Sequence, residues 1–190
     1  MNTKQWSGFL GISALVIALA FLVDQWFLPL IPLLRIPVLD SLFTFMGSSL
    51  GLVVFFFIVG VLLLWKDSQK ILYFMAAVLT ALAASYLLKY ALMRPRPDIL
   101  PLLVKSSPSF PSTHAAVAGS VYFFARKLGR MEKSVVLLLG ILVAVSGFYN
   151  GVHYLSDIVA GIVLGLIIGY VSEAKLPAWV AHKDKKTLRN

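Results

Sequence analysis

Long apolar runs separated by short polar breaks dominate the sequence. The first run, about residues 8–28, is broken only by Asp24 and Gln25 near its far end. A helix of about 20 apolar residues crosses the roughly 30 Å hydrocarbon core of a bilayer. Further runs lie at about residues 39–65, 71–93, 112–124, 135–149 and 155–171. The pattern predicts an all-α, polytopic membrane protein with six transmembrane helices.

Three details of this pattern shape the expected chain path. The first run lacks the cleavage site of a signal peptide, so we expect it to be retained as a span. The second run is long enough either to tilt in the bilayer or to begin with a short interfacial helix. Residues 94–111 form the longest polar connection and contain five prolines, and Ser112 is expected to cap the helix that follows them.

Composition agrees with a membrane protein. The 190 residues are 59% hydrophobic and 13% charged, with a mean hydropathy of +0.89, whereas soluble domains are about half apolar and about a quarter charged. Cysteine is absent, which excludes disulfides and thiolate metal sites. We expect one membrane domain over residues 1–175 and a basic cytoplasmic tail over residues 176–190.

The net charge of +9 does not indicate nucleic-acid binding, because the basic residues stand at the ends of apolar runs. Six spans place both termini on one side. Twelve of the 17 basic residues then fall on that side: Lys4, Lys66, Lys70, Arg126, Lys127, Arg130, Lys133, Lys175, Lys183, Lys185, Lys186 and Arg189. Positive charge favours the cytoplasmic side, so both termini are expected in the cytoplasm, in an inner-membrane protein.

Three polar runs carry most of the candidate chemistry, at residues 89–97, 111–114 and 146–157. In the first, Lys89 and Arg96 are seven residues apart, about two helical turns, and can face one anion. Taken singly, each of them is more simply explained as an interfacial anchor. The prolines at 95 and 97 stiffen the chain beside them and favour the anion site.

The second and third runs add a helix N-terminus and two histidines. Ser112 opens a helix whose free N–H groups favour a bound phosphate, with His114 beside it as a proton donor. His153 and Asp157, four residues apart, suit one helix face, where the carboxylate orients the imidazole. Taken singly, each histidine is also explained by a structural hydrogen bond.

Together the three runs supply cations, a helix N-terminus, a proton donor and an oriented nucleophile at one membrane face. This set suits phosphoryl transfer without a metal. Only Asp98 and Asp157 are acidic residues near the runs, too few for a magnesium site. We expect no cofactor.

The motifs Lys-x6-Arg-Pro over residues 89–97, Pro-Ser-x-His over 111–114 and Ser-x6-His-x3-Asp over 146–157 are specific in order and spacing. In these three motifs, the chain resembles the type 2 phosphatidic acid phosphatase superfamily of membrane lipid phosphatases. The resemblance implies that His153 forms a phosphohistidine, Asp157 orients it and His114 protonates the leaving oxygen. It also implies that the phosphate is held by Lys89, Arg96, Ser112 and the Thr113 amide, with Arg94 lining the entrance.

Two positions depart from the family pattern. Thr113 replaces a glycine, which leaves the backbone N–H available. Gly147 replaces an arginine that would clamp the phosphate, and loss of one such donor typically costs about 10²–10³ in rate. Either Arg94 or Lys105 substitutes for it, the substrate differs, or catalysis is impaired. We expect that Gly147→Arg does not abolish turnover, whereas His153→Ala does.

The expected function is hydrolysis of a lipid mono- or diphosphate at the outer face of the membrane. An isoprenoid carrier diphosphate such as undecaprenyl diphosphate is favoured, followed by phosphatidylglycerol phosphate and phosphatidic acid. A phosphotransferase shares the same site, and a lipid-phosphate binder or transporter is the alternative without catalysis. The vanadate-using haloperoxidases share these motifs but are soluble.

Overall fold

The computed structural model describes residues 3–66, 70–126 and 128–175, and within them all regular structure is helical. The expected tail, residues 176–190, lies outside the described residues. The elements follow in this order: α1 (Thr3–Phe27), η1 (Leu28–Leu30), η2 (Pro32–Leu34), α2 (Pro37–Gly47), α3 (Ser49–Lys66), α4 (Ile71–Leu92), α5 (Thr113–Ala125), α6 (Arg130–Tyr149), α7 (Leu155–Tyr170) and η4 (Val171–Lys175).

Helix length and hydropathy identify a multi-pass membrane protein. Five helical stretches in the described residues are long and apolar enough to cross a bilayer: Lys4–Leu30, Ser49–Lys66, Ile71–Leu92, Arg130–Tyr149 and Leu155–Glu173. Their outward faces carry exposed apolar side chains such as Leu22, Phe57 and Leu87, each at least 67% exposed. Such a surface requires lipid rather than water.

The expected fourth span, residues 112–124, is the short helix α5. It has 13 residues, about 20 Å at 1.5 Å per residue, and falls short of the roughly 30 Å core. Its Ser112 cap is confirmed, since the Ser112 side chain accepts a hydrogen bond from the Ala115 N–H at 3.4 Å. The expected second span is divided at Ser48 into the short α2 and the longer α3, so its short leading helix is confirmed.

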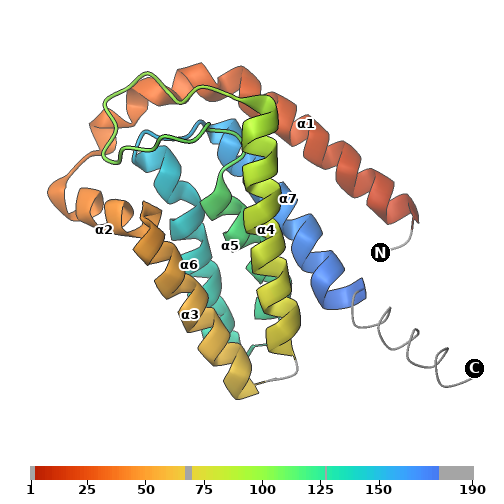
Figure 1. The fold of residues 1–190 in the computed structure, drawn as a ribbon. Coiled ribbons are helices and arrows are strands. Elements are labelled where there is room, and N and C mark those ends of the chain that lie inside the picture. The colour runs from red at the N-terminus through yellow and green to blue at the C-terminus, as the bar shows by residue number, and fades with distance from the viewer. Residues whose placement is uncertain (1–2, 67–69, 127, 176–190) are drawn as a thin grey trace, which may run out of the picture.

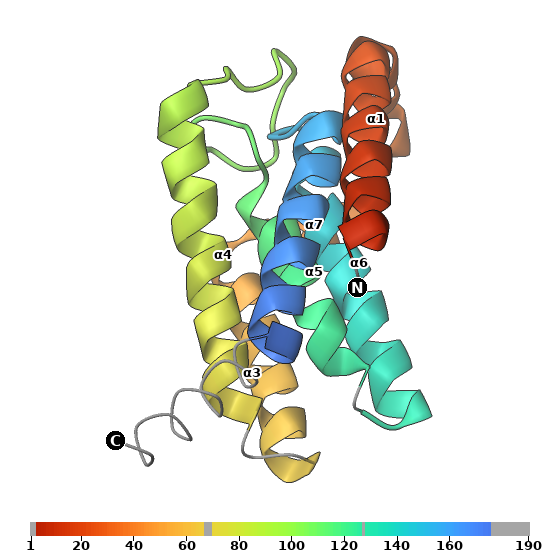
Figure 2. The same cartoon turned by 90° about the vertical axis from the view of Figure 1, so that its right-hand side faces the viewer.

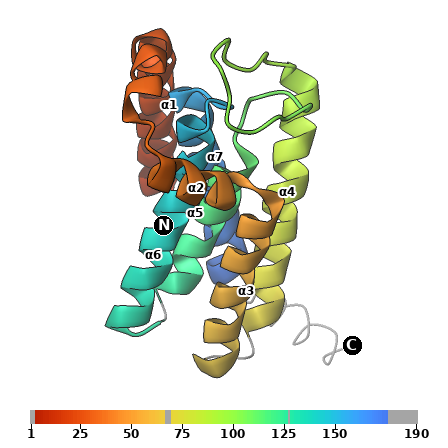
Figure 3. The same ribbon diagram turned by 90° about the vertical axis from the view of Figure 1, so that its left-hand side faces the viewer.

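The helices α3 to α7 form a bundle, and α1 packs against α7 on its outside (Figures 1 and 2). Residues 93–112 arch over one end of the bundle, where α4 ends and α5 and α7 begin (Figure 1). We call this the site end. At this end α2 connects across the bundle to α3, as Figure 3 shows from the other side.

Helices α5 and α7 form the closest packed pair, because glycines bring their backbones into contact. A Cβ added to Gly161 would lie 2.5 Å from the Ser112 carbonyl oxygen, and one on Gly165 would lie 2.1 Å from that of Ala116. One on Gly169 would lie 2.3 Å from the Ser120 oxygen. Small residues at four-residue spacing are typical of close membrane-helix contacts. This contact places the start of α7 beside the start of α5.

We predict that Gly165→Ala destabilises the protein. The new methyl group would overlap backbone atoms of α5, and backbone cannot move away by a change of rotamer as a side chain can. Overpacking of this kind costs about 1–3 kcal/mol of unfolding free energy. The measurement is the melting temperature in detergent. Gly11→Ala is the matched control, since a Cβ at Gly11 meets nothing within 4 Å; equal melting temperatures for the two variants would contradict the predicted contact.

Candidate active site

A buried histidine–aspartate pair lies where α6 turns into α7. His153 Nδ1 is 3.1 Å from Asp157 Oδ2, and the Tyr154 N–H donates to the same oxygen at 3.0 Å. The contact predicted from the spacing is therefore confirmed. His153 precedes the helix, however, and meets Asp157 through the capping geometry of the first turn rather than across a helix face.

The pairing determines which nitrogen of His153 is available. Asp157 occupies Nδ1 and leaves Nε2 to face a reactant, as a nucleophile requires. Burial lowers the pKa of His153 to about 4, although the hydrogen bond and the charge of Asp157 oppose this shift. His153 is therefore neutral, with a free lone pair, at physiological pH.

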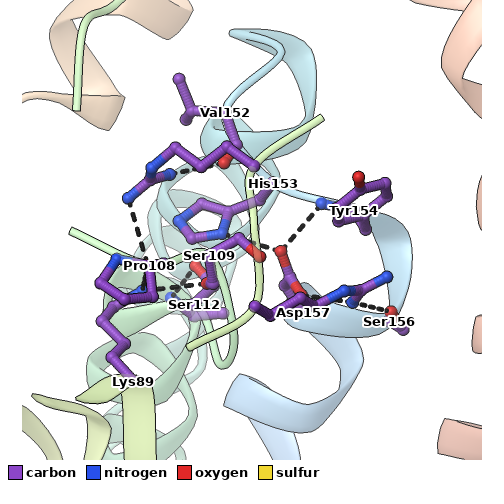
Figure 4. Close-up of polar contacts among 12 residues, drawn as sticks. Lys89, Pro108, Ser109, Ser112, Val152, His153, Tyr154, Ser156 and Asp157 are labelled. Atoms are coloured by element: carbon purple, nitrogen blue, oxygen red, sulfur yellow. Dashed lines mark hydrogen bonds and ion pairs between the residues drawn. The ribbon is translucent and has the colours of Figure 1, made fainter. Parts of the chain in front are cut away.

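Two cations predicted to bind phosphate reach the site from α4 and the connection after it. Lys89 Nζ donates to the carbonyl oxygens of Pro108 at 2.8 Å and Ser109 at 2.9 Å. Figure 4 shows His153 between these contacts and Asp157. Arg96 donates to the Val152 carbonyl oxygen, next to the histidine, and from Nε to the Ser107 oxygen at 2.8 Å.

Both cations are held by neutral carbonyl groups. Within the described residues neither Lys89 nor Arg96 forms an ion pair with a carboxylate. Burial is the main cause that lowers the pKa of Arg96, which reflects a charge removed from water. A buried Lys89 and a partly buried Arg96, neither in an ion pair within the described residues, make this end of the bundle attractive to an anion.

The start of α5 is the third part of the site. The Ser112 N–H donates to the Asp157 carbonyl oxygen at 3.0 Å, which ties the two helices together. The Thr113 hydroxyl oxygen is buried and, within the described part of the chain, has no hydrogen-bond partner. His114 Nε2 is 3.1 Å from the Ser48 carbonyl oxygen at the α2–α3 junction. All seven predicted catalytic and phosphate-binding residues thus gather at the site end.

Arg94 does not line an entrance or replace a phosphate clamp, so that expectation is wrong. Its guanidinium forms an ion pair with Asp157 Oδ1 at 2.6 Å and another with Asp24 Oδ2 at 2.8 Å. It also lies over the Tyr154 ring, 3.9 Å from the centroid. Two carboxylates and a ring face hold Arg94 on the far side of Asp157 from His153.

Asp24 joins the site although it lies 65 residues from the nearest motif. It is 2% exposed and accepts a hydrogen bond from the Ser156 N–H at 2.9 Å. Its position within an apolar run was the available signal, because an acidic residue inside a membrane segment requires a partner. The motif spacing alone did not identify that partner.

Gly147 lies against the histidine ring. A Cβ at this position would be 2.5 Å from His153 Cδ2, so any side chain here must displace the ring. The expectation that Gly147→Arg does not abolish turnover stays a prediction, and this contact counts against it. Glycine allows the last turn of α6 to support His153 directly.

Lys105 is a further cation at the site end. Its Nζ lies 3.3 Å from the Gly47 carbonyl oxygen, and burial together with the charge of Arg96 lowers its pKa. Since its charge also acts on Lys89 and His114, Lys105 belongs to the same cationic cluster.

Comparisons with known proteins identify relatives of this chain. A family model described as the PAP2 superfamily matches residues 70–179. Phosphatidylglycerophosphatase B of Bacillus subtilis (strain 168) is 38% identical over 95 residues, which cover 44% of this chain and 47% of that protein. The chain therefore matches about half the length of this relative.

Two solved structures share the fold. The crystal structure of a transmembrane PAP2 type phosphatidylglycerolphosphate phosphatase from Bacillus subtilis aligns with a TM-score of 0.68 and 25% identity, covering 90% of this chain and 92% of that one. LpxE of Aquifex aeolicus aligns with the same TM-score and identity over 79% of this chain and 94% of that one.

We predict that Gly147→Ala slows any reaction that uses His153 as nucleophile by about 100-fold, since a misplacement of about 1 Å has effects of this size. Turnover of a phosphate ester is measured alongside the melting temperature. Gly140→Ala in the same helix is the control, because a Cβ there would lie 3.6 Å from its nearest neighbour, an ordinary contact. Wild-type turnover in Gly147→Ala would show that the ring has room to move.

Proposed function

Because the chain belongs to the PAP2 superfamily, we propose that it is a metal-independent membrane phosphatase that hydrolyses a lipid phosphate through a phosphohistidine. The observation that carries the proposal is the 3.1 Å contact between His153 Nδ1 and Asp157, which leaves the second ring nitrogen free. The positive charges of Lys89 and Arg96 beside it, which form no ion pair in the described residues, support a phosphate as the reactant.

The first half-reaction transfers the phosphoryl group to the histidine. His153 Nε2 attacks phosphorus, the bond from phosphorus to the lipid oxygen breaks, and its electron pair goes to that oxygen. His114 gives the oxygen a proton. Asp157 stabilises the positive charge on the phosphorylated imidazole. For this role His114 exchanges its contact with the Ser48 carbonyl oxygen for one with the leaving oxygen.

The second half-reaction returns the enzyme to its starting state. Water attacks the phosphohistidine and His114 takes its proton, by microscopic reversibility of the first step. The phosphorus–nitrogen bond breaks, its electrons return to His153, and inorganic phosphate leaves. If an alcohol attacks instead of water, the same site performs phosphotransfer.

We place this site at the outer face of the cytoplasmic membrane, with α5 as the fourth of six spans and both termini inside. The support is the distribution of charge: if the chain has six spans, 12 of its 17 basic residues fall on the side of the termini, as is typical of the cytoplasmic side. The five others, Arg35, Lys89, Arg94, Arg96 and Lys105, lie on the side of the site. The basic segment 176–190 is proposed as a cytoplasmic tail.

The substrate we place first is a glycerolipid monophosphate such as phosphatidylglycerophosphate. Its support is the name of the Bacillus relative, a phosphatidylglycerophosphatase. This reverses the order expected from the sequence, in which an isoprenoid diphosphate came first. An isoprenoid diphosphate remains the second candidate, because Lys105 adds a third positive charge to Lys89 and Arg96, and a diphosphate carries more negative charge than a monophosphate.

We predict that purified wild-type protein releases phosphate from a lipid phosphate in the presence of a chelator. His153→Ala should lower the rate to below about one-thousandth, since loss of a nucleophile removes the covalent route. The assay offers phosphatidylglycerophosphate, phosphatidic acid and undecaprenyl diphosphate and identifies each product. Retained hydrolysis by folded His153→Ala would contradict the phosphohistidine mechanism. Binding without release would favour a lipid binder or transporter.

We predict that Lys105→Met lowers the preference for a diphosphate over a monophosphate bearing the same lipid chain. The ratio of their kcat/KM values should fall about tenfold or more, because a hydrogen bond to a charged group contributes about 1.5–3 kcal/mol. Farnesyl diphosphate and farnesyl phosphate provide the matched pair. Lys133→Met, in the first turn of α6, is the control. An unchanged ratio in Lys105→Met would remove the support for a diphosphate as the substrate.

A further inference from the structure

One guanidinium joins the buried aspartate of the first helix to the aspartate that holds the catalytic histidine. Arg94 Nη1 is 2.6 Å from Asp157 Oδ1, and Arg94 Nη2 is 2.8 Å from Asp24 Oδ2. Ser156 stands between the two acids: it accepts from Arg94 at 2.7 Å, and its own N–H and hydroxyl donate to Asp24. The chain of contacts is Asp24, Arg94, Asp157, His153.

Burial strengthens the electrostatic interactions in this series of contacts. Asp157 is fully buried and Asp24 is 2% exposed, so water does little to screen either. The remaining neighbours of the guanidinium are aromatic faces, Tyr154 at 3.9 Å and Phe21 at 4.6 Å from the ring centroids. With two carboxylates and one guanidinium, the group carries a net charge of −1.

The net charge matters for His153. If Arg94 had Asp157 as its only partner, that pair would be neutral, and Asp157 would stabilise a positive imidazole weakly. Asp24 draws part of the charge of Arg94 to itself, because both carboxylates bind the same guanidinium. Asp157 then keeps more negative charge on Oδ2, the oxygen that faces His153 Nδ1.

We propose that Asp24 is a positioning residue that acts through Arg94 to keep Asp157 negative and correctly placed for His153. The proposal rests on the proposed phosphohistidine function, in which Asp157 stabilises the charged intermediate. Asp24 touches neither substrate nor His153. Its partners on α7 and in the connection after α4 make the first helix part of the active site rather than a membrane anchor alone.

The test is Asp24→Asn, which keeps the shape of the side chain and removes its charge. We expect kcat to fall about 10- to 100-fold. This is the size of effect found at metal sites when a residue that hydrogen-bonds to a metal ligand is removed. KM should stay near the wild-type value, because Lys89 and Arg96 are unchanged. The Nδ1–H proton resonance of His153, assigned with His153→Gln, should move upfield as its hydrogen bond to Asp157 weakens.

The resonance is recorded without substrate, so it decides the role of Asp24 even if the protein releases no phosphate. Asp98→Asn, at an exposed aspartate of the connection between α4 and α5, is the matched control and should change neither kcat nor the resonance. A lower melting temperature in Asp24→Asn, with kcat and the resonance unchanged, would overturn the proposal and leave Asp24 as a helix anchor.

Arg94→Met provides the second variant. It leaves Asp24 and Asp157 as two unpaired buried carboxylates, and we expect a lower melting temperature and a loss of turnover. Adding Asp24→Asn to Arg94→Met should raise the melting temperature again, because one uncompensated charge is removed. If the two substitutions have simply additive effects, the two residues are not coupled and the proposal fails.

Discussion

The close backbone contact between α5 and α7 is the constraint on which the rest of the site depends. Gly161 and Gly165 meet the carbonyl oxygens of Ser112 and Ala116, so the two helices begin side by side. The Ser112 N–H reaches the Asp157 carbonyl oxygen as a result. A bulkier interface would separate the N-terminus of α5 from the histidine that precedes α7.

The basic residues on the two sides of His153 have different partners, and these partners decide what each basic residue can bind. On one side, Lys89 and Arg96 are held by carbonyl oxygens of the chain and keep their charge for an anion. On the other side, Arg94 is paired with two carboxylates, which neutralise its positive charge. Three basic residues within eight positions of the sequence thus serve two different purposes.

The membrane class, five of the six expected spans and the contact between His153 and Asp157 were predictable from local patterns. Hydropathy runs report helices because each span must satisfy its backbone within itself. The motif residues could be found because their spacing is short: Lys89 with Arg96, and His153 with Asp157. The Gly161, Gly165 and Gly169 spacing also carried a packing signal, which hydropathy alone does not use.

The sequence by itself determined that the chain crosses a membrane, and it indicated which residues are candidates for the phosphate chemistry. Only the tertiary structure decided the partners of Arg94, the inclusion of Asp24, and the reason for glycine at position 147. The physical reason is distance along the chain: Asp24 lies 70 residues from Arg94, and the space beside Gly147 is filled by a ring from the following turn. Neither contact follows from helical periodicity, because both arise where separate elements pack together.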